Sequence, residues 1–373
     1  MDRQMILLLV IMSITLLYTR AKDTDYNKKI CVTAITVVLA LFSGFRSWWL
    51  GDLIKYYTDY LNCNGADWRD YVFQDYTNMG LPLFFRGAGA VGISFDVCIF
   101  IIAVFFSVAL GILVYRFSPS PYWSYLMFIA MGFYIFTFSG LKQTCAMGFI
   151  IFAMMAILDN RPVRFVIWVL IASVFHAPAL VFLAAYPMAK KKINASYFFL
   201  IAAIIILVYF FHDQIVEMMA EAYYEEEKLY VASGGIGGRV LMMALIMVFG
   251  VVMRPLRKRD TVFRQVFNLM VVAAIIQYFS TYDNVFSRLA DYYYQFIVLF
   301  LPLAMERGDH QALVQPERQY EIRYFTHRSY LLIGLAITLF ALWYYNSYID
   351  SSQAILQDFR FFWEIDPYSL YGK

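Results

Sequence analysis

Charged residues are scarce in this chain of 373 residues, where Asp, Glu, Lys and Arg supply only 15% of the positions. Soluble globular domains carry about 25% of such residues. The sequence is 62% hydrophobic, and its apolar runs are spread evenly from end to end. This composition excludes an ordinary water-soluble fold. It predicts an all-α integral membrane protein with a single polytopic domain over 1–373.

Motifs of soluble metal and nucleotide enzymes are also missing. The chain contains no H-E-x-x-H, G-x-x-x-x-G-K-S/T or G-x-G-x-x-G sequence. None of its four cysteines belongs to a C-x-x-C pair, so we interpret Cys31, Cys63, Cys98 and Cys145 as structural residues. No internal repeat or low-complexity tract is visible. We expect no bound metal, no cofactor and no nucleic-acid partner.

Long apolar runs are what the sequence does contain. A membrane span needs roughly 17–25 mostly apolar residues, so these runs predict a bundle of about ten to twelve transmembrane helices. The first run is followed by Thr19-Arg20-Ala21-Lys22 instead of a small-x-small cleavage site, which predicts a retained first span. The candidate spans are 3–19, 30–45, 95–115, 122–138, 141–158, 195–211, 239–253, 262–281, 288–305 and 329–348.

The charges of the loops predict an orientation, because Lys and Arg gather on the cytoplasmic side. Basic residues concentrate in 20–29, 190–192, 254–261 and 306–328, which we place inside. Acidic residues concentrate in 46–93, 212–238 and 349–373, which we place outside. Within the outer segment 46–93, the aromatic and acidic stretches 52–60 and 67–76 are typical of amphipathic helices lying in the interface.

This topology constrains the apolar stretch 164–189. Arg164 and Lys190 must both lie inside, so the chain has to enter the membrane and return within this stretch. Two full spans would need roughly 40 residues. The sequence therefore predicts a re-entrant or broken hairpin of two short helices, with His176 and Pro178 at its apex on the outer side.

Charged residues at the outer ends of the spans are candidate substrate ligands, because ionisable groups in a membrane usually face a cavity or one another. Arg288 begins a polar helix face that continues through Asp291, Tyr292 and Gln295, and Asn268 and Gln277 lie on the preceding span. The candidate ligands and acids are Arg46, Asp52, Lys142, Gln143, Arg239, Arg288 and Tyr292.

Cations that converge on an outer cavity suit a lipid-linked diphosphate, since Arg offers a planar fork and Lys a point charge. His176 could accept a proton from a sugar hydroxyl. Simpler interpretations stay open for the same residues. His176 could be a satisfied core residue, Arg46 and Arg288 could be interfacial anchors, and Asp52 could cap a helix.

Four segments carry a family resemblance. They are Arg46 with Gly51-Asp52, Tyr56 and Tyr60; Ser139-Gly140-Leu141-Lys142-Gln143 with Ala146; Ala172–Leu180 around Phe175-His176; and Ser287-Arg288 with Tyr292 and Pro302. In this order they resemble the R…G-D…Y…Y, S-x-x-R-Q-x-x-A, A-x-x-F-H-x-S-A-L and R…Y…P elements of EpsG-like membrane proteins. Lys142 replaces an arginine of that pattern, and Pro178 replaces a serine.

The resemblance implies a Wzy-type polysaccharide polymerase in the bacterial cytoplasmic membrane, with a bundle related to the GT-C glycosyltransferases. Such enzymes join undecaprenyl-diphosphate-linked oligosaccharides, as donor and acceptor, into exopolysaccharide, capsule or O-antigen. The partners implied are these lipids, membrane lipids and a chain-length regulator. Arg46, Lys142, Gln143, Arg239, Arg288 and Tyr292 would bind substrate, with His176 or Asp52 as the base. An O-antigen-type ligase, a transporter or flippase, and a membrane O-acyltransferase are the alternatives.

Overall fold

The architecture is helical throughout the part of the chain that can be followed. The structure is a computed structural model, and the residues it describes are 7, 10–14, 17–18, 24–47, 53–74, 78–192, 195–223, 238–253, 260–281, 285–305, 336, 338–340, 342–344 and 360–364. Every regular element among them is a helix, and the β-contact they contain is an isolated bridge between Arg46 and Phe361. The all-α fold class predicted from composition is confirmed.

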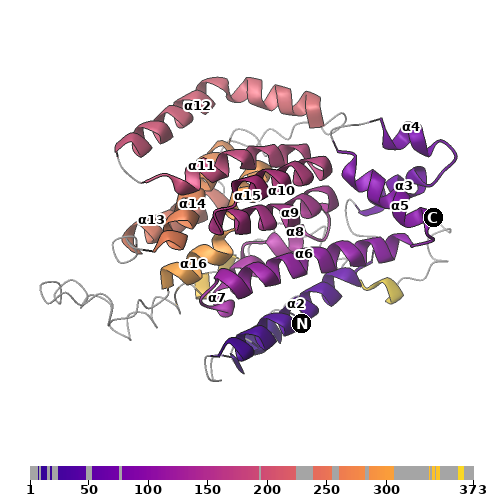
Figure 1. Cartoon of the computed structure of the whole chain (residues 1–373), viewed down its shortest axis with the longest axis horizontal. Helices are drawn as coiled ribbons and strands as arrows, with labels where there is room; N and C mark the ends of the chain where they lie inside the picture. The colour runs from indigo at the N-terminus through magenta and orange to yellow at the C-terminus, as the bar shows by residue number, and fades with distance from the viewer. Residues whose placement is uncertain are drawn as a thin grey trace, which may run out of the picture.

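Four described helices are long and apolar enough to cross a membrane: α2 (Asp25–Gly44), α6 (Phe95–Phe117), α9 (Leu141–Leu158) and α14 (Thr261–Phe279). They correspond to four of the predicted spans. Helix α6 packs against both α2 and α9, and the three run side by side in Figure 1. The chain is therefore a multi-pass membrane protein. The total of about ten to twelve spans stays a prediction, because 3–19 and 329–348 lie largely outside the described residues.

Three short helices form a cap at one end of this bundle. They are α3 (Leu53–Cys63), α4 (Trp68–Val72) and α5 (Gly80–Ala90), and they lie beside the N-terminal end of α6 (Figure 1). The Tyr60 hydroxyl donates to the Ile93 carbonyl (2.7 Å), and the Asn64 amide donates to the Phe85 carbonyl (3.3 Å). These bonds join α3 to α5 and to the start of α6. We call α3, α4 and α5 the cap, and the bundle end beside it the cap end.

Basic side chains mark the opposite end of the bundle. Arg116 at the end of α6 pairs with Asp159 after α9 (2.9 Å), and the Lys28 ammonium donates to the Ser118 carbonyl (2.7 Å). This far end also carries the exposed residues Lys191 and Lys192. The cap and these basic residues therefore lie at opposite ends of the bundle, and the orientation itself, with the basic loops cytoplasmic and the cap outside, stays a prediction.

The stretch after α9 is a helical hairpin. It consists of α10 (Pro162–Phe175), the 3₁₀ helix η1 (Ala177–Ala184) and α11 (Ala185–Lys190). His176 between α10 and η1 has an extended backbone, with φ −153° and ψ 102°. The Lys190 ammonium donates to the Ile157 carbonyl (2.8 Å) and to the Asn160 side chain, so the hairpin ends beside its own start. The short helices on either side of His176 are as predicted, and the re-entry of this hairpin into the membrane stays a prediction.

Two other predicted spans are broken as well. The range 122–138 divides into α7 (Pro121–Ala130) and α8 (Phe133–Phe136), separated by Gly132 at φ 79°. The range 288–305 divides into α15 (Val285–Tyr294) and α16 (Ile297–Met305). The breaks meet, because the Tyr294 hydroxyl donates to the Met131 sulfur (3.3 Å). Both breaks are buried by protein, which is the condition for non-helical backbone at membrane depth.

Helices α12 (Ala195–Tyr223) and α13 (Gly238–Met253) complete the described bundle. Helix α12 bends at Phe211, lies along the outside of the bundle in Figure 1, and exposes large apolar side chains such as Phe199 and Phe210. Helix α13 packs against α14. The predicted outer loop 212–238 begins as helix, since 212–223 belong to α12, and its remainder up to 237 lies outside the described residues. The predicted cytoplasmic loop 306–328 also lies outside them.

Candidate active site

Several of the polar residues singled out in the sequence lie at the cap end, on three elements, whereas the amide of Asn268 donates to the Met188 and Lys191 carbonyls toward the far end. Helix α9 begins with Leu141 and carries Lys142 and Gln143 in its first turn. The hairpin contributes His176 at its apex, and α15 contributes Arg288 and Tyr292. The Gln143 amide donates to the Arg288 backbone carbonyl (3.0 Å), which ties α9 directly to α15.

His176 and Tyr292 form the centre of this cluster. The His176 Nδ1 atom and the Tyr292 hydroxyl are hydrogen-bonded at 2.6 Å. Tyr292 is fully buried, so this bond fixes the orientation of a ring that sits at a break in the hairpin. The positive charges that act on His176 are those of Arg288 and Lys142. Five of the residues singled out in the sequence are therefore brought together: Lys142, Gln143, His176, Arg288 and Tyr292.

Arg239, in the first turn of α13, makes its own contacts to α15. Its guanidinium pairs with the Asp291 carboxylate, donates to the Ser287 hydroxyl (2.8 Å) and lies over the Tyr294 ring (5.3 Å to the centroid). The Asp291 side chain is 5% exposed and that of Arg239 is 26% exposed. Arg239 thus neutralises a buried carboxylate and still presents an accessible edge. Asp291 stands next to Tyr292, so this ion pair adjoins the cluster.

Arg46 lies apart from the cluster in its contacts. Its side chain is buried and donates to the backbone carbonyls of Phe138 (2.9 Å), Thr137 (3.3 Å) and Ser43. Thr137 and Phe138 immediately precede the turn into α9. Arg46 therefore holds the end of α2 against the start of the Lys142 helix, and its guanidinium is directed at carbonyl groups. Asp52, the other acid considered as a base, lies outside the described residues.

Asn78 is a site residue that sequence reasoning missed. Its side-chain oxygen accepts a hydrogen bond from the Ala177 backbone N–H (3.2 Å), directly after His176. Two residues later Gly80 lies so close to Phe175 that a Cβ atom there would stand 2.8 Å from the Phe175 ring. The cap is thus docked onto the hairpin apex. No spacing could indicate this contact, because the partner of Asn78 is a backbone group.

The cap also reaches Lys142 through Cys63 at the end of α3. Burial, followed by the Asp59 carboxylate, raises the pKa of Cys63 to about 11, while Lys142 and Arg86 lower it. Asp59 in turn accepts a hydrogen bond from the Tyr71 hydroxyl at 2.5 Å. Lys142 therefore stands between the cap and the His176 cluster. Within the described ranges, no group of three or more His, Cys, Asp or Glu residues could hold a metal ion.

Comparison with known proteins gives one match. The sequence model of the EpsG family matches residues 29–313, which include every predicted site residue. A search of curated proteins and a search of solved structures each returned no match to the chain.

Proposed function

Because the chain belongs to the EpsG family, we propose that it is a membrane glycosyltransferase that polymerises undecaprenyl-diphosphate-linked oligosaccharide repeat units. It would act at the outer face of the bacterial cytoplasmic membrane and make an exopolysaccharide, a capsule or an O-antigen. The observation that carries the proposal is the hydrogen-bonded pair His176–Tyr292 beside Lys142 and Arg288, at the end of the bundle predicted to face outward.

The helix termini at the cap end support an anionic substrate. Lys142 is the second residue of α9, whose first turn contains no acidic residue, whereas Arg239, the second residue of α13, already has the Asp291 carboxylate beside it. The amino end of a helix carries positive partial charge, so a cation there is unfavourable unless an anion lies nearby. Backbone N–H groups and cations at such termini suit phosphate oxygens. A lipid-linked diphosphate meets this requirement.

The proposed reaction assigns a role to each group. An acceptor hydroxyl attacks the anomeric carbon of the donor, the bond from that carbon to the diphosphate oxygen breaks, and the hydroxyl proton passes to His176. Polyprenyl diphosphate leaves with its negative charge stabilised by Lys142, Arg239 and Arg288. Arg46 acts by positioning the start of α9. Asp52 is the alternative base.

The bond to Tyr292 is compatible with the tautomer that this role needs. When the Nδ1–H group of His176 donates to the Tyr292 hydroxyl oxygen, the lone pair lies on Nε2 and can accept the substrate proton. The reverse arrangement, in which the Tyr292 hydroxyl donates to Nδ1, would leave a proton on Nε2. Tyr292 is therefore proposed to orient the base and to select its tautomer.

The test uses purified protein and a synthetic undecaprenyl-diphosphate-linked repeat unit, and it follows chain length and released undecaprenyl diphosphate. Loss of a general base costs about 10²–10⁴-fold in rate, so His176→Gln should abolish long polymer. His212→Gln is the matched control, because His212 lies on α12 and bonds to the Tyr209 carbonyl of its own helix. If His176→Gln polymerises at the parent rate, His176 is structural and Asp52→Asn is tested in the same assay.

A second candidate, a transporter or flippase of lipid-linked sugar, is favoured by one observation. Helices α7–α8 and α15–α16 are both broken, and their breaks meet inside the bundle. Transporters often bind substrate at discontinuous helices near the membrane midplane. Proteoliposomes separate the two functions: a transporter moves a labelled lipid-linked sugar to the other leaflet without lengthening it. A polymerase lengthens it.

A further inference from the structure

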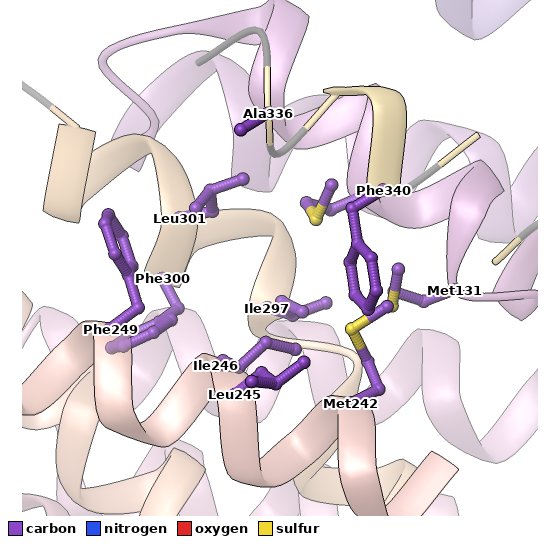
Figure 2. A pocket seen from close by; sticks show the side chains of 11 residues that line it. Met131, Met242, Leu245, Ile246, Phe249, Ile297, Phe300, Leu301, Ala336 and Phe340 are labelled. Carbon is purple, nitrogen blue, oxygen red and sulfur yellow. The ribbon is translucent and has the colours of Figure 1, made fainter. Parts of the chain in front are cut away.

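An apolar cavity of about 300 Å³ lies away from the polar cluster, between α7, α13, α16 and the residues around Phe340 (Figure 2). No charged side chain lines it. Figure 2 shows Met131 and Met242 at one end and Phe249 and Phe300 at the other, with Ile246 between them. From Met242 to Phe249 the helix rises by about 10 Å. The cavity is therefore an elongated space that follows α13 along the bundle.

One end of the cavity adjoins the cationic end of α13. Met242 lies three residues after Arg239, which places both side chains on the same helix face. Met131 accepts a hydrogen bond from the Tyr294 hydroxyl, and the Tyr294 ring lies under the Arg239 guanidinium at 5.3 Å. Met131 and Arg239 thus contact opposite parts of the Tyr294 side chain, which places this end of the cavity near Arg239. A ligand with an anionic head and an apolar tail fits this arrangement, with the head at Arg239 and the tail in the cavity.

We propose that this cavity holds the polyprenyl chain of the lipid diphosphate, with the diphosphate at Arg239 and the chain running along α13 toward Phe249. The inference rests on the proposed function and adds the place and direction of the lipid tail. Three methionines, Met127, Met131 and Met242, line the cavity. Their unbranched, polarisable side chains adapt to an irregular branched hydrocarbon better than β-branched residues do. The sugar would then project from the diphosphate toward Lys142 and His176.

The first experiment locates the chain directly. The parent protein is photolabelled with undecaprenyl diphosphate that carries a diazirine in its isoprenoid chain, and the labelled peptides are identified by mass spectrometry. Label on α13 or α16, displaced by unlabelled undecaprenyl diphosphate but not by undecaprenol or phosphatidylglycerol at the same concentration, is the expected result. Label confined to helices other than α7, α13 and α16 overturns the proposal. So does equal displacement by phosphatidylglycerol, which would mean that ordinary membrane lipid fills the cavity.

The second experiment fills the cavity from one helix. Ile246→Trp places an indole in the middle of the space, whereas Val248→Trp places one on the 61% exposed side of the same helix. We expect Ile246→Trp to lower use of an undecaprenyl-linked donor at least about tenfold, because several buried chain carbons lose their contacts. From Arg239 to Ile246 the helix rises by about 10 Å, so a donor with a single five-carbon isoprene unit ends before Ile246 and should be affected much less. Thermal melting in detergent verifies that both variants fold.

The two hypotheses can fail separately. Specific label on α13 or α16 in a protein that never lengthens a repeat unit would leave the lipid site standing and remove the polymerase. Normal polymerisation by a folded Ile246→Trp variant, from the undecaprenyl-linked and the five-carbon donor alike, would leave the polymerase standing and remove the lipid site.

Discussion

A buried arginine needs acceptors on every side, and Arg46 finds them in three backbone carbonyls. Hydrogen bonds from a charged donor contribute about 1.5–3 kcal/mol each. We therefore expect Arg46→Gln to lower the free energy of unfolding by about 3 kcal/mol, and Arg46→Lys to recover only part of it, since an ammonium cannot span all three carbonyls. Thermal melting in detergent measures this. If Arg46→Gln leaves the stability unchanged but abolishes diphosphate binding, Arg46 is instead a substrate ligand, as the sequence predicted.

The ion pair between Arg239 and Asp291 predicts a pattern among three variants. Removing one partner of a buried pair costs about 3–5 kcal/mol, because the other charge is left uncompensated. Arg239→Gln should therefore destabilise the protein, and Arg239→Gln combined with Asp291→Asn should recover most of the loss. The double variant should bind undecaprenyl diphosphate more weakly than the parent protein, since the cation is gone. A double variant as unstable as Arg239→Gln would show that the pair does not act as a unit.

Sequence patterns could indicate which residues are polar at the outer ends of spans, and four of them do meet around His176. The patterns could not indicate the partners. Asp291 was expected on the polar face of its helix, but its pairing with Arg239 joins two helices far apart in sequence. Asn78 and the carbonyls bonded to Arg46 are still less visible, because one member of each contact is a backbone group common to every residue.

At the scale of elements, the docking of α5 on the hairpin gives a matched pair of substitutions. Gly80→Ala puts a Cβ atom 2.9 Å from the Val174 carbonyl oxygen, whereas Gly87 on the same helix has nothing within 4 Å of that position. Gly80→Ala must therefore displace the hairpin apex. A displacement of reacting groups by about 1 Å can cost on the order of 10²-fold in rate, so we expect a severe loss of polymer.

Gly87→Ala serves as the control for that substitution. It should leave activity unchanged and raise stability by about 0.5–1 kcal/mol, because alanine loses less backbone entropy than glycine in a helix. Polymer length and thermal melting are measured for both variants. Equal activity of the two would mean that the contact between α5 and the hairpin has no influence on the reacting groups.

Hydropathy predicted where helices lie, but it did not predict where a helix is interrupted. The range 122–138 is mostly apolar, and 288–305 combines a polar face in its first half with an apolar second half, so the sequence pattern predicts one helix for each. The chain departs from α-helical geometry at Gly132, which adopts a positive φ that other residues avoid, and again after Tyr294. Both departures depend on contacts between the two broken helices. The hairpin was predictable because the charges at its two ends limit its length.

For the whole molecule, the orientation can be tested with two exposed positions. The native cysteines are buried, and burial raises the pKa of Cys63 to about 11, so they contribute little thiolate at neutral pH. Asp67→Cys lies in the cap and Lys191→Cys at the far end. In intact cells, an impermeant maleimide should label position 67 and should label position 191 only after permeabilisation. The opposite pattern would mean that the predicted orientation is wrong and that the proposed site faces the cytoplasm.

The bridge between Arg46 and Phe361 has a consequence for the time course of synthesis. The Ser47 N–H group donates to the Arg360 carbonyl (2.7 Å), and the Phe362 N–H group donates to the Phe45 carbonyl (3.0 Å). Segments made early fold first while the ribosome is still elongating. The end of α2, which steadies the Lys142 helix through Arg46, must therefore wait until residue 362 has been made before it gains these two bonds. A polypeptide released before residue 360 would lack both of them, so its α2 end would be held by Arg46 alone.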